Sequence, residues 1–414
     1  MHDFTEPLTH RIHVDPEDES DEDYLEDEAS EFCISSCTSE DRPLCVPNLA
    51  CSKIARLIYF MAVVISLYFL YAIFFASGNF ANGASKSPTF NLTKASNILG
   101  TLCAEYSQGH VDGLLCPRLC TTPNYTITDL YDKGSKVVIK IQSNDKENIL
   151  KMDKAFFRDY DQLNPSLSEE EFTDAVLDTV NDRLHLGWAK EYKSHLMRKL
   201  WSGYKKGALT QAHRETVWAL LSQDEFLNLK LLQASRVLPK VLDTCGHVYQ
   251  VEHLIPFRMK GYYMNLKAKI LLHLVGTLKL FDEFLNEPLQ FCDVKFENLG
   301  LSSDYPKRFV IMDSDMLYTQ TKLHTMLTSK QCVNDNECSL FDCESRCDTT
   351  TGYCTGRLND NIDVFCKKLI NKIFGNFWSK NNRYLAACHE PAPVNATKRL
   401  NDLRLVWAWN LADV

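Results

Sequence analysis

The most informative stretch of this chain is FCDVKFENLGLSSDYPKRFVIMDSD, residues 291–315. Its first part places three polar side chains at short intervals: Asp293 is followed by Lys295 two residues on and by Asn298 five residues on. Its last part holds a short apolar run, FVIM, which predicts a buried strand, and Asp313 comes directly after this run. Two carboxylates, an ammonium group and an amide are therefore expected to converge within one loop and one strand.

This combination of side chains is the one that phosphoryl transfer requires. A carboxylate takes the proton of the acceptor hydroxyl, carboxylate and amide oxygens hold Mg²⁺, and a cation neutralises the transferred phosphate. The order also matches the protein-kinase catalytic loop, H-R-D-x-K-x-x-N, followed by a strand and the metal-binding aspartate of D-F-G. We therefore predict Asp293 and Lys295 as catalytic residues, and Asn298 and Asp313 as metal ligands. The alternative is that Asp293 and Asn298 are turn residues that close a loop.

Segments upstream of this loop occur in the order expected for the N-terminal lobe of a kinase. The run KVVIKIQ, 136–142, predicts a strand, and its Lys140 matches the V-A-I-K lysine that binds the α- and β-phosphates. A predicted helix with Glu225 follows, where helix C supplies the partner carboxylate of that lysine. We predict Lys140 and Glu225 as nucleotide-binding residues; an exposed strand lysine and a solvated helix glutamate are the alternatives. Glu215 and the acidic cluster 169–171 compete with Glu225 for this role.

An uncharged apolar segment, 57–76, precedes these motifs. About 20 apolar residues in a helix span the hydrocarbon core of a bilayer. Lys53 and Arg56 lie just before the segment and the next basic residue is Lys86, so the bias of basic residues places the N-terminus in the cytosol. We predict a transmembrane signal-anchor and a single-pass type II topology. A cleaved signal peptide and a buried core helix are the alternatives.

The predicted domain order follows from this span. An acidic, disordered cytosolic tail covers 1–56, a lumenal stalk covers 77–100, and a lumenal kinase-like domain covers 101–414. The stretch 15–31 has no basic residue, and so charged a run buries too little apolar surface to fold. The formal net charge of −9 argues against nucleic acid as a partner, since binding to phosphates requires a basic face.

Glycosylation sequons and most cysteines lie on the C-terminal side of the span. Three N-x-[ST] sequons begin at Asn91, Asn124 and Asn395. Of the 16 cysteines, those after residue 100 are even in number, and disulfides persist only in oxidising compartments. We therefore predict that the C-terminus is lumenal. The cysteines assigned to disulfides are Cys103, Cys116, Cys120, Cys245, Cys332, Cys338, Cys343, Cys347, Cys354, Cys366 and Cys388.

Cys292 is interpreted differently, because it takes the position of the arginine in H-R-D. Five of the assigned cysteines lie in the segment 332–354, with the spacing C-x5-C-x4-C-x3-C-x6-C. Since five is odd, at least one of them must pair outside the segment. Cys366 and Cys388 are the candidates for that partner.

The chain resembles the divergent protein kinase domain 1 family, whose members are cysteine-rich, kinase-like type II proteins of the endoplasmic reticulum membrane. The resemblance rests on LCAEYSQGHVDGLLCPRLC at 102–120, VWALLSQDEFL at 217–227, FCDVKFENLGL at 291–301 and the cysteine spacing of 332–354. It implies an α+β, two-lobed, disulfide-rich protein-kinase-like domain behind one N-terminal transmembrane helix. It also implies an insertion at about 145–213 with a degenerate EF-hand-like segment. Lys206 and His213 occupy ligand positions of that segment, so we expect no Ca²⁺ there.

Departures from the kinase pattern bear on activity. No G-x-G-x-x-G precedes Lys140, Ser314 and Asp315 replace the Phe-Gly of D-F-G, and no A-P-E follows. Our first hypothesis is an atypical secretory-pathway kinase that uses ATP with Mg²⁺ or Mn²⁺ and phosphorylates a lumenal protein or glycan. The second is a lumenal pseudokinase that acts as a binding or scaffold module without catalysis. A cysteine-rich structural ectodomain without a nucleotide site is the third.

Overall fold

The computed structural model divides into two units, 1–84 and 85–414. It describes residues 59–66, 68, 88–133, 136–233, 236–257, 264–283, 287–302, 309–390 and 396–404. In the first unit, residues 59–66 are helical. Among the described residues, no helix is both long and apolar enough to cross a membrane. The predicted tail, 1–56, and most of the predicted span, 57–76, lie outside the described residues.

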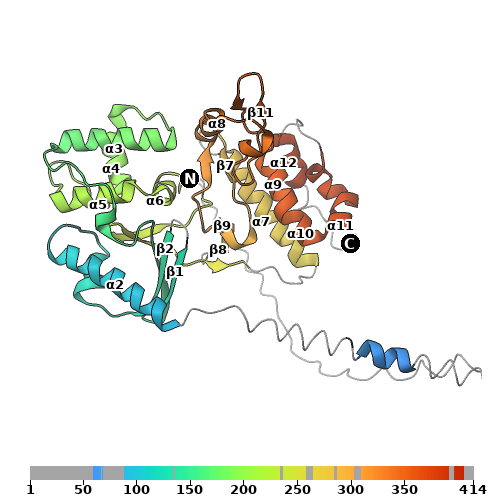
Figure 1. The fold of residues 1–414 in the computed structure, drawn as a ribbon, viewed down its shortest axis with the longest axis horizontal. Coiled ribbons are helices and arrows are strands. Elements are labelled where there is room, and N and C mark those ends of the chain that lie inside the picture. The colour runs from blue at the N-terminus through green and yellow to red at the C-terminus, as the bar shows by residue number, and fades with distance from the viewer. Residues whose placement is uncertain are drawn as a thin grey trace, which may run out of the picture. The chain divides into compact units, whose positions relative to one another are not determined.

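Helix α2 (Pro88–Ser107) shows that the fold of the second unit begins earlier than the predicted boundary at residue 101. The predicted stalk, 77–100, is therefore helical from residue 88 on, and its earlier part lies outside the described residues. Ala95, Ile98 and Leu102 recur at helical spacing and are buried. They pack with the first strands of the sheet, beside which α2 lies in Figure 1.

The next segment builds a five-stranded antiparallel sheet in the order β1-β2-β3-β5-β4. Its strands are β1 (Thr126–Lys133), β2 (Lys136–Ser143), β3 (Lys146–Met152), β4 (Val241–Cys245) and β5 (Val248–Val251). β2 confirms the strand predicted at 136–142. The predicted insertion, 145–213, differs from the structure, because its first residues form β3. Alternation explains this strand, since Leu150 and Met152 are buried and Lys151 between them faces the other side.

Helices α3 (Glu169–Leu184), α4 (Lys193–Leu200), α5 (Gln211–Leu221) and α6 (Asp224–Leu231) lie between β3 and β4. Ser168 begins α3 with a capping box: its hydroxyl accepts from the Glu171 amide, and the Glu171 carboxylate accepts from the Ser168 amide. α4 and α5 form a helix-loop-helix at the predicted EF-hand-like segment, where Thr210 and His213 cap α5. Figure 1 shows α3, α4 and α5 grouped together.

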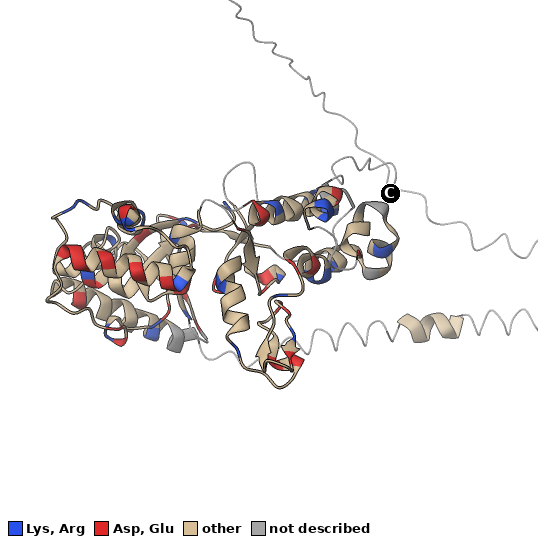
Figure 2. Cartoon of the chain, turned by 90° about the horizontal axis from the view of Figure 1, so that it is seen from above, with Lys and Arg blue, Asp and Glu red and all other residues tan. Residues whose placement is uncertain are grey.

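The C-terminal half is mainly helical. α7 (Met264–Asp282) leads to β7 (Leu289–Phe291), and β8 (Leu299–Leu301), β9 (Phe309–Ile311) and β10 (Leu317–Thr319) follow. β8 pairs with β9 and with β6 (Ile255–Pro256), and β10 pairs with β7. The later elements are α8 (Gln320–Thr328), β11 (Cys347–Asp348), β12 (Tyr353–Cys354), α9 (Asn361–Phe365), α10 (Asn371–Phe374), α11 (Asn376–Asn381) and α12 (Ala396–Arg404). The prediction of a mixed helix and sheet fold is confirmed. Figure 2 shows that acidic and basic residues are interleaved along the helices.

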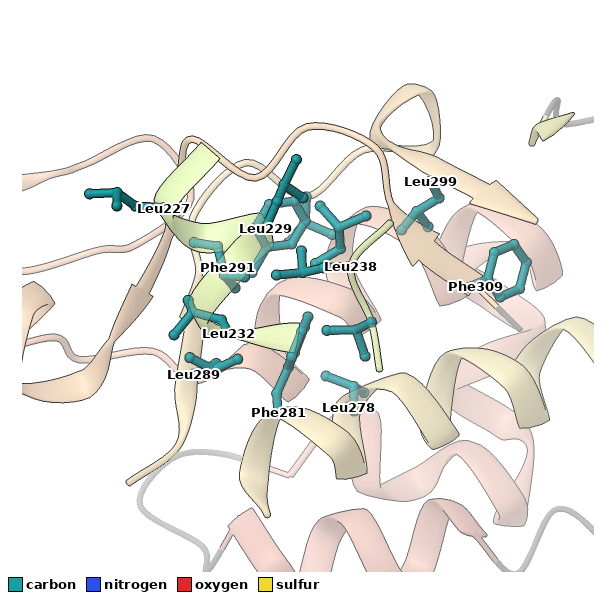
Figure 3. Close-up of a cluster of buried hydrophobic side chains, with 14 of the residues drawn as sticks. Leu227, Leu229, Leu232, Leu238, Leu278, Phe281, Leu289, Phe291, Leu299 and Phe309 are labelled. Carbon is teal, nitrogen blue, oxygen red and sulfur yellow. The ribbon is translucent and has the colours of Figure 1, made fainter. Parts of the chain in front are cut away.

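A hydrophobic core fixes the loop that joins β7 to β8. We call this loop (292–298) the catalytic loop, after the kinase pattern that it resembles. Phe281 of α7, Leu289 and Phe291 of β7 and Leu299 of β8 are fully buried in one cluster (Figure 3). Burying a side chain of this size contributes about 1.5–3 kcal/mol. Because both ends of the catalytic loop start from this core, its polar side chains begin from fixed backbone positions.

Six disulfides join all twelve cysteines after residue 100. They are Cys103–Cys120, Cys116–Cys245, Cys292–Cys343, Cys332–Cys347, Cys338–Cys354 and Cys366–Cys388. The eleven predicted disulfide cysteines are confirmed. In the segment 332–354, called the cysteine-rich loop below, Cys343 pairs outside the loop as predicted. The predicted partner was wrong, because Cys366 and Cys388 bond to each other. Cys343 pairs with Cys292, which was not among the eleven assigned cysteines. Since eleven is odd, one further cysteine was needed to complete the pairs.

Candidate functional site

The catalytic loop brings three of the predicted residues together. Lys295 Nζ donates to Asp293 Oδ2 at 2.7 Å, and Asn298 Nδ2 donates to the same oxygen at 2.8 Å. Asn298 Nδ2 also donates to Asp293 O at 3.0 Å. This bond joins the end of the short helix Phe296–Asn298 to the start of the loop. The hydrogen bond to Asp293 raises the pKa of Lys295, so this lysine stays a cation at neutral pH.

The end of β9 lies against the catalytic loop. Met312 N donates to Asn298 O at 2.8 Å, which joins the strand to the loop one residue before Asp313. The Asp313 carboxylate accepts a hydrogen bond from Lys136 Nζ at 2.6 Å. Asp313 therefore follows a short strand bonded to the catalytic loop, which is the arrangement of the metal-binding aspartate in a kinase.

Lys151 of β3 makes the lysine-glutamate pair that was expected for Lys140. Lys151 Nζ donates to Glu225 Oε1 at 2.8 Å and to Met312 O at 2.7 Å. Tyr249 of β5 donates its hydroxyl hydrogen to Glu225 Oε2 at 3.0 Å. Glu225 lies in the first turn of α6, so its carboxylate joins the sheet to this helix, and Lys151 extends the connection to the end of β9.

Lys140 does not reach the site, and its predicted role is corrected here. Its side chain is 43% exposed, with Nζ 3.8 Å from Asp129 Oδ2 and 3.6 Å from Glu147 Oε1. In the sheet register, Lys151 of β3 lies opposite Val138 of β2, and Lys140 follows Val138 two residues later. Lys140 is therefore displaced along β2 from the position beside Lys151, which contacts Glu225 of α6. The run ILK at the end of β3 carries the same apolar-lysine signal as VVIK. In a kinase this lysine lies on the third strand of the sheet, and only the order of the strands shows that ILK, and not VVIK, belongs to that strand.

Glu225 is the buried charge at the centre of the site. Burial alone would raise its pKa, but the ammonium groups of Lys151 and Lys136 outweigh burial and lower the pKa of Glu225 to about 2. The carboxylate is therefore ionised at neutral pH. The competing acidic residues have other partners, since Glu215 accepts from a glutamine of its own helix and Glu171 caps α3.

Lys136 adds a second ammonium group that the motifs did not indicate. Its Nζ lies 2.6 Å from Asp313 Oδ1, 2.8 Å from Asp315 Oδ1 and 3.0 Å from Glu225 Oε2. Burial would lower the pKa of Lys136, but these three carboxylates raise it well above its ordinary value. Lys136 is the first residue of β2, next to the β1–β2 turn where a kinase has its glycine-rich loop. The sequence signal that could have identified Lys136 is its place at the start of the predicted strand, beside this turn.

The same carboxylates could hold a metal ion. Single oxygens of Glu225, Asp313 and Asp315 lie within 4.8 Å of one another. Carboxylate oxygens are ligands that suit Mg²⁺ and Mn²⁺, and the space between them already accommodates the positive charge of Lys136. Asn298 points its amide nitrogen into the catalytic loop, so its amide oxygen is the atom that could face a metal. The residues therefore fit a divalent ion, provided that the ammonium group moves.

The raised pKa values of one carboxyl group of this cluster and of one beside it indicate that the cluster is short of positive charge. Burial raises the pKa of Asp315 to about 6, although Lys136 opposes the shift. Burial, with Asp315 and Glu225 nearby, raises the pKa of Asp153 to about 7. Asp153 follows β3 directly, and its amide donates to a glutamine side chain before α6. Entry of a cation is favoured where carboxylates repel one another in this way.

The predicted glycosylation sites lie in different surroundings. Asn124 is exposed in the irregular segment just before β1. Asn91 lies within α2, and Asn395 lies outside the described residues. Asn124 is therefore the sequon whose accessibility the structure shows.

A five-stranded sheet with a lysine-glutamate pair, a D-x-K-x-x-N loop and an aspartate after the next strand define a protein-kinase-like domain. Residues 217–401 match the family model described as the protein-kinase domain of FAM69. This match confirms the resemblance to the divergent protein kinase domain 1 family that the motifs indicated. The matched residues contain the catalytic loop and the cysteine-rich loop, whereas Lys136 and Lys151 precede them.

Proposed function

We propose that this chain is an atypical secretory-pathway kinase that transfers phosphate from ATP to a hydroxyl group of a lumenal acceptor. One set of contacts carries the proposal: Lys151 to Glu225, Lys136 to Asp313, and the bonds of the catalytic loop around Asp293. These are the groups that phosphoryl transfer needs, gathered from four separate parts of the chain. The match to a kinase-domain family supports the same class of protein.

Each residue has a task in this proposal. Lys151, oriented by Glu225, binds the phosphates of the nucleotide. Lys136 neutralises phosphate charge at the turn where the glycine-rich loop is missing. Asp313 and Asn298 hold Mg²⁺ or Mn²⁺, and the bound ion supplies further neutralisation of the phosphate oxygens.

Asp293 is the proposed base. Lys295 and Asn298 both donate to its Oδ2, which orients the carboxylate and leaves Oδ1 to accept the hydroxyl proton. Lys295 also supplies positive charge beside the transferred phosphate. The three side chains therefore act as one unit that positions the acceptor oxygen and removes its proton.

The proposed location is the endoplasmic reticulum membrane, with a single-pass type II anchor and the kinase-like domain in the lumen. Six disulfides support an oxidising compartment. The exposed Asn124 supports access to the glycosylation machinery. The acceptor is a lumenal protein or glycan, and the net charge of −9 supports a role that does not involve nucleic acid.

A lumenal pseudokinase is the second candidate, and one observation favours it. The ammonium group of Lys136 lies among Glu225, Asp313 and Asp315, in the position that a metal would take. A site that keeps this lysine in place would bind ligands without catalysis. The domain would then serve as a binding or scaffold module.

The test is nucleotide binding and phosphate transfer by the full-length chain in detergent. ATP with Mg²⁺ or Mn²⁺ should raise the melting temperature, because a ligand at 100 times its Kd stabilises the folded state by about 2.7 kcal/mol. Asp293→Asn should keep this shift and lose transfer by at least about 100-fold, since it removes the base. Asp313→Asn should lose the metal-dependent part of the shift.

The outcomes separate the candidates. Transfer by the wild type that Asp293→Asn abolishes supports the kinase. Nucleotide binding without transfer to any protein or glycan acceptor supports the pseudokinase. A melting temperature that no combination of nucleotide and metal changes contradicts both.

A further inference from the structure

The cysteine-rich loop is bonded to the catalytic loop on both sides of Asp293. On one side, Cys292 forms a disulfide with Cys343. On the other side, the amide of Val294 donates to Asp342 Oδ2 at 2.8 Å. Two neighbouring residues of one loop thus hold the two residues that flank the proposed base.

Asp342 is itself fixed from several directions. Its amide donates to Cys292 O at 2.8 Å, and its carbonyl oxygen accepts from Asn359 Nδ2 at 2.8 Å. Its Oδ1 lies 2.8 Å from Lys368 Nζ, and the side chain is only 14% exposed. The backbone bonds fix the position of the residue, and the carboxylate cannot swing away from Val294 without breaking its ion pair with Lys368.

Packing and further disulfides make the cysteine-rich loop a stiff support. Cys292 and Cys343 are fully buried in a small cluster with Leu323 and Leu327 of α8. Two disulfides within the loop and the strand pair β11–β12 brace it internally. A braced loop that is bonded at two points can set the position of the backbone to which it is bonded.

The contacts of Asp293 within its own loop cannot do this. Lys295 and Asn298 orient the carboxylate relative to the catalytic loop, but they do not fix the first half of that loop against its neighbours. The nucleotide-binding pair Lys151 and Glu225 lies on β3 and α6, and its contacts in the described part of the chain do not involve the cysteine-rich loop. The lysine-glutamate pair and the backbone on either side of the base are therefore held by different contacts.

We propose that Asp342 and the Cys292–Cys343 disulfide are positioning residues that hold Asp293 at the geometry for phosphate transfer. The inference rests on the proposed function. The position of Cys292 carries an arginine in the kinase pattern H-R-D, and a covalent bond replaces it here. Loss of the bonds lowers kcat and leaves the binding of ATP unchanged, because a displacement of about 1 Å costs roughly 100-fold in rate.

The test compares Asp342→Ala with Glu344→Ala in the full-length chain in detergent. Glu344 belongs to the same loop, but its side chain is 57% exposed and pairs with Lys367 at 3.4 Å on the surface. Asp342→Ala should lower kcat by about 10- to 100-fold and change the KM for ATP by less than about 3-fold. Asp342→Glu should recover part of kcat, and Glu344→Ala should match the wild type.

A disulfide comparison tests the other side of Asp293. The double variant Cys292→Ala, Cys343→Ala should lower kcat in the same way. Its control is Cys366→Ala, Cys388→Ala, which removes a disulfide that makes no bond to the catalytic loop among the described residues. The control should lose stability and keep its kcat.

A second measurement does not need activity. Hydrogen exchange in the peptide 289–298 reports on the amide of Val294, which should exchange at least about 10-fold faster in Asp342→Ala and at the wild-type rate in Glu344→Ala. Melting temperatures show whether the variants fold. If Asp342→Ala does not fold, Asp342→Asn replaces it in the test, because asparagine keeps the shape of the side chain.

Faster exchange together with a lower kcat and an unchanged KM for ATP supports the inference. Unchanged exchange, an unchanged kcat, or a loss of ATP binding as large as the loss of kcat overturns it. A wild type that transfers no phosphate refutes the proposed function instead, and the exchange of Val294 still decides whether Asp342 holds the catalytic loop.

Discussion

Lys151 Nζ lies 2.8 Å from Glu225 Oε1, although 74 positions separate the two residues in the chain. The pair joins β3 to α6, and Lys151 also reaches Met312 O at the end of β9. Glu225 is almost completely buried, so loss of its partners would leave an unpaired charge in a medium of low polarity. The proposed nucleotide-binding half of the site is therefore organised around this pair.

Lys151→Met should abolish tight nucleotide binding. A hydrogen bond to a charged group contributes about 1.5–3 kcal/mol, which corresponds to a rise in Kd of roughly 10- to 100-fold. Lys140→Met is the matched control, because it removes the same side chain from the neighbouring strand, and its Kd should stay at the wild-type value. Titration with a fluorescent ATP analogue measures both. A raised Kd for Lys140→Met with a normal Kd for Lys151→Met would return the assignment to Lys140.

Lys136→Met should bind Mn²⁺ more tightly in the absence of nucleotide. The ammonium group and the ion compete for the oxygens of Glu225, Asp313 and Asp315, and removing a unit charge at this distance is expected to change the affinity at least about 10-fold. The same variant should bind ATP more weakly, because a phosphate partner is lost. A titration followed by the electron paramagnetic resonance of free Mn²⁺ measures the ion. Equal Mn²⁺ affinities in variant and wild type would show that Lys136 does not compete for the site.

His247 should make the folded domain less stable in mild acid. The ring lies fully buried in the β4–β5 turn, where burial lowers the pKa of His247 to about 4 despite a hydrogen bond with Ala155 O. The unfolded chain, with an ordinary histidine pKa of about 6.5, binds a proton between these values while the folded chain does not. The stabilisation is complete above about pH 6.5 and is lost as the pH falls toward 4, by on the order of 2 kcal/mol at pH 5.

Denaturant unfolding at pH 7.5 and pH 5 measures this dependence. His247→Phe has no titrating ring, so the difference in unfolding free energy between the two pH values should shrink by about 2 kcal/mol relative to the wild type. His253→Gln changes a histidine whose side chain is 43% exposed, and it should keep the wild-type dependence. The comparison isolates His247 from the other titrating groups. Identical pH dependence in His247→Phe and the wild type would refute the prediction.

Asn124 should carry a glycan if the domain folds in the lumen. The residue is exposed, and its sequon Asn-Tyr-Thr precedes β1 without taking part in a helix or strand. Asn124→Gln should remove one mobility step that endoglycosidase removes from the wild type. Asn381→Gln changes an exposed asparagine outside any sequon, and its mobility should not change. A wild type whose mobility is insensitive to endoglycosidase would contradict the lumenal location.

Much of the candidate site could be predicted from local pattern. Asp293, Lys295 and Asn298 are neighbours in sequence, and they bond to one another within a single loop. The strand before Asp313 needs only a short apolar run, and the helix start at Ser168 needs only a capping residue. Such features depend on residues a few positions apart, so a pattern of residue types is enough to predict them.

The contacts between distant segments could not be predicted from local pattern. Lys140 and Lys151 both end apolar runs on adjacent strands, and only the hairpin register and the packing of α6 determine that Lys151 meets Glu225. The pairing of Cys292 with Cys343 likewise needs two Cα atoms brought to 5.0 Å across 51 positions of chain. Contacts between distant segments are set by how whole elements pack, because the free energy that selects them is spread over a core and is not contained in either local sequence.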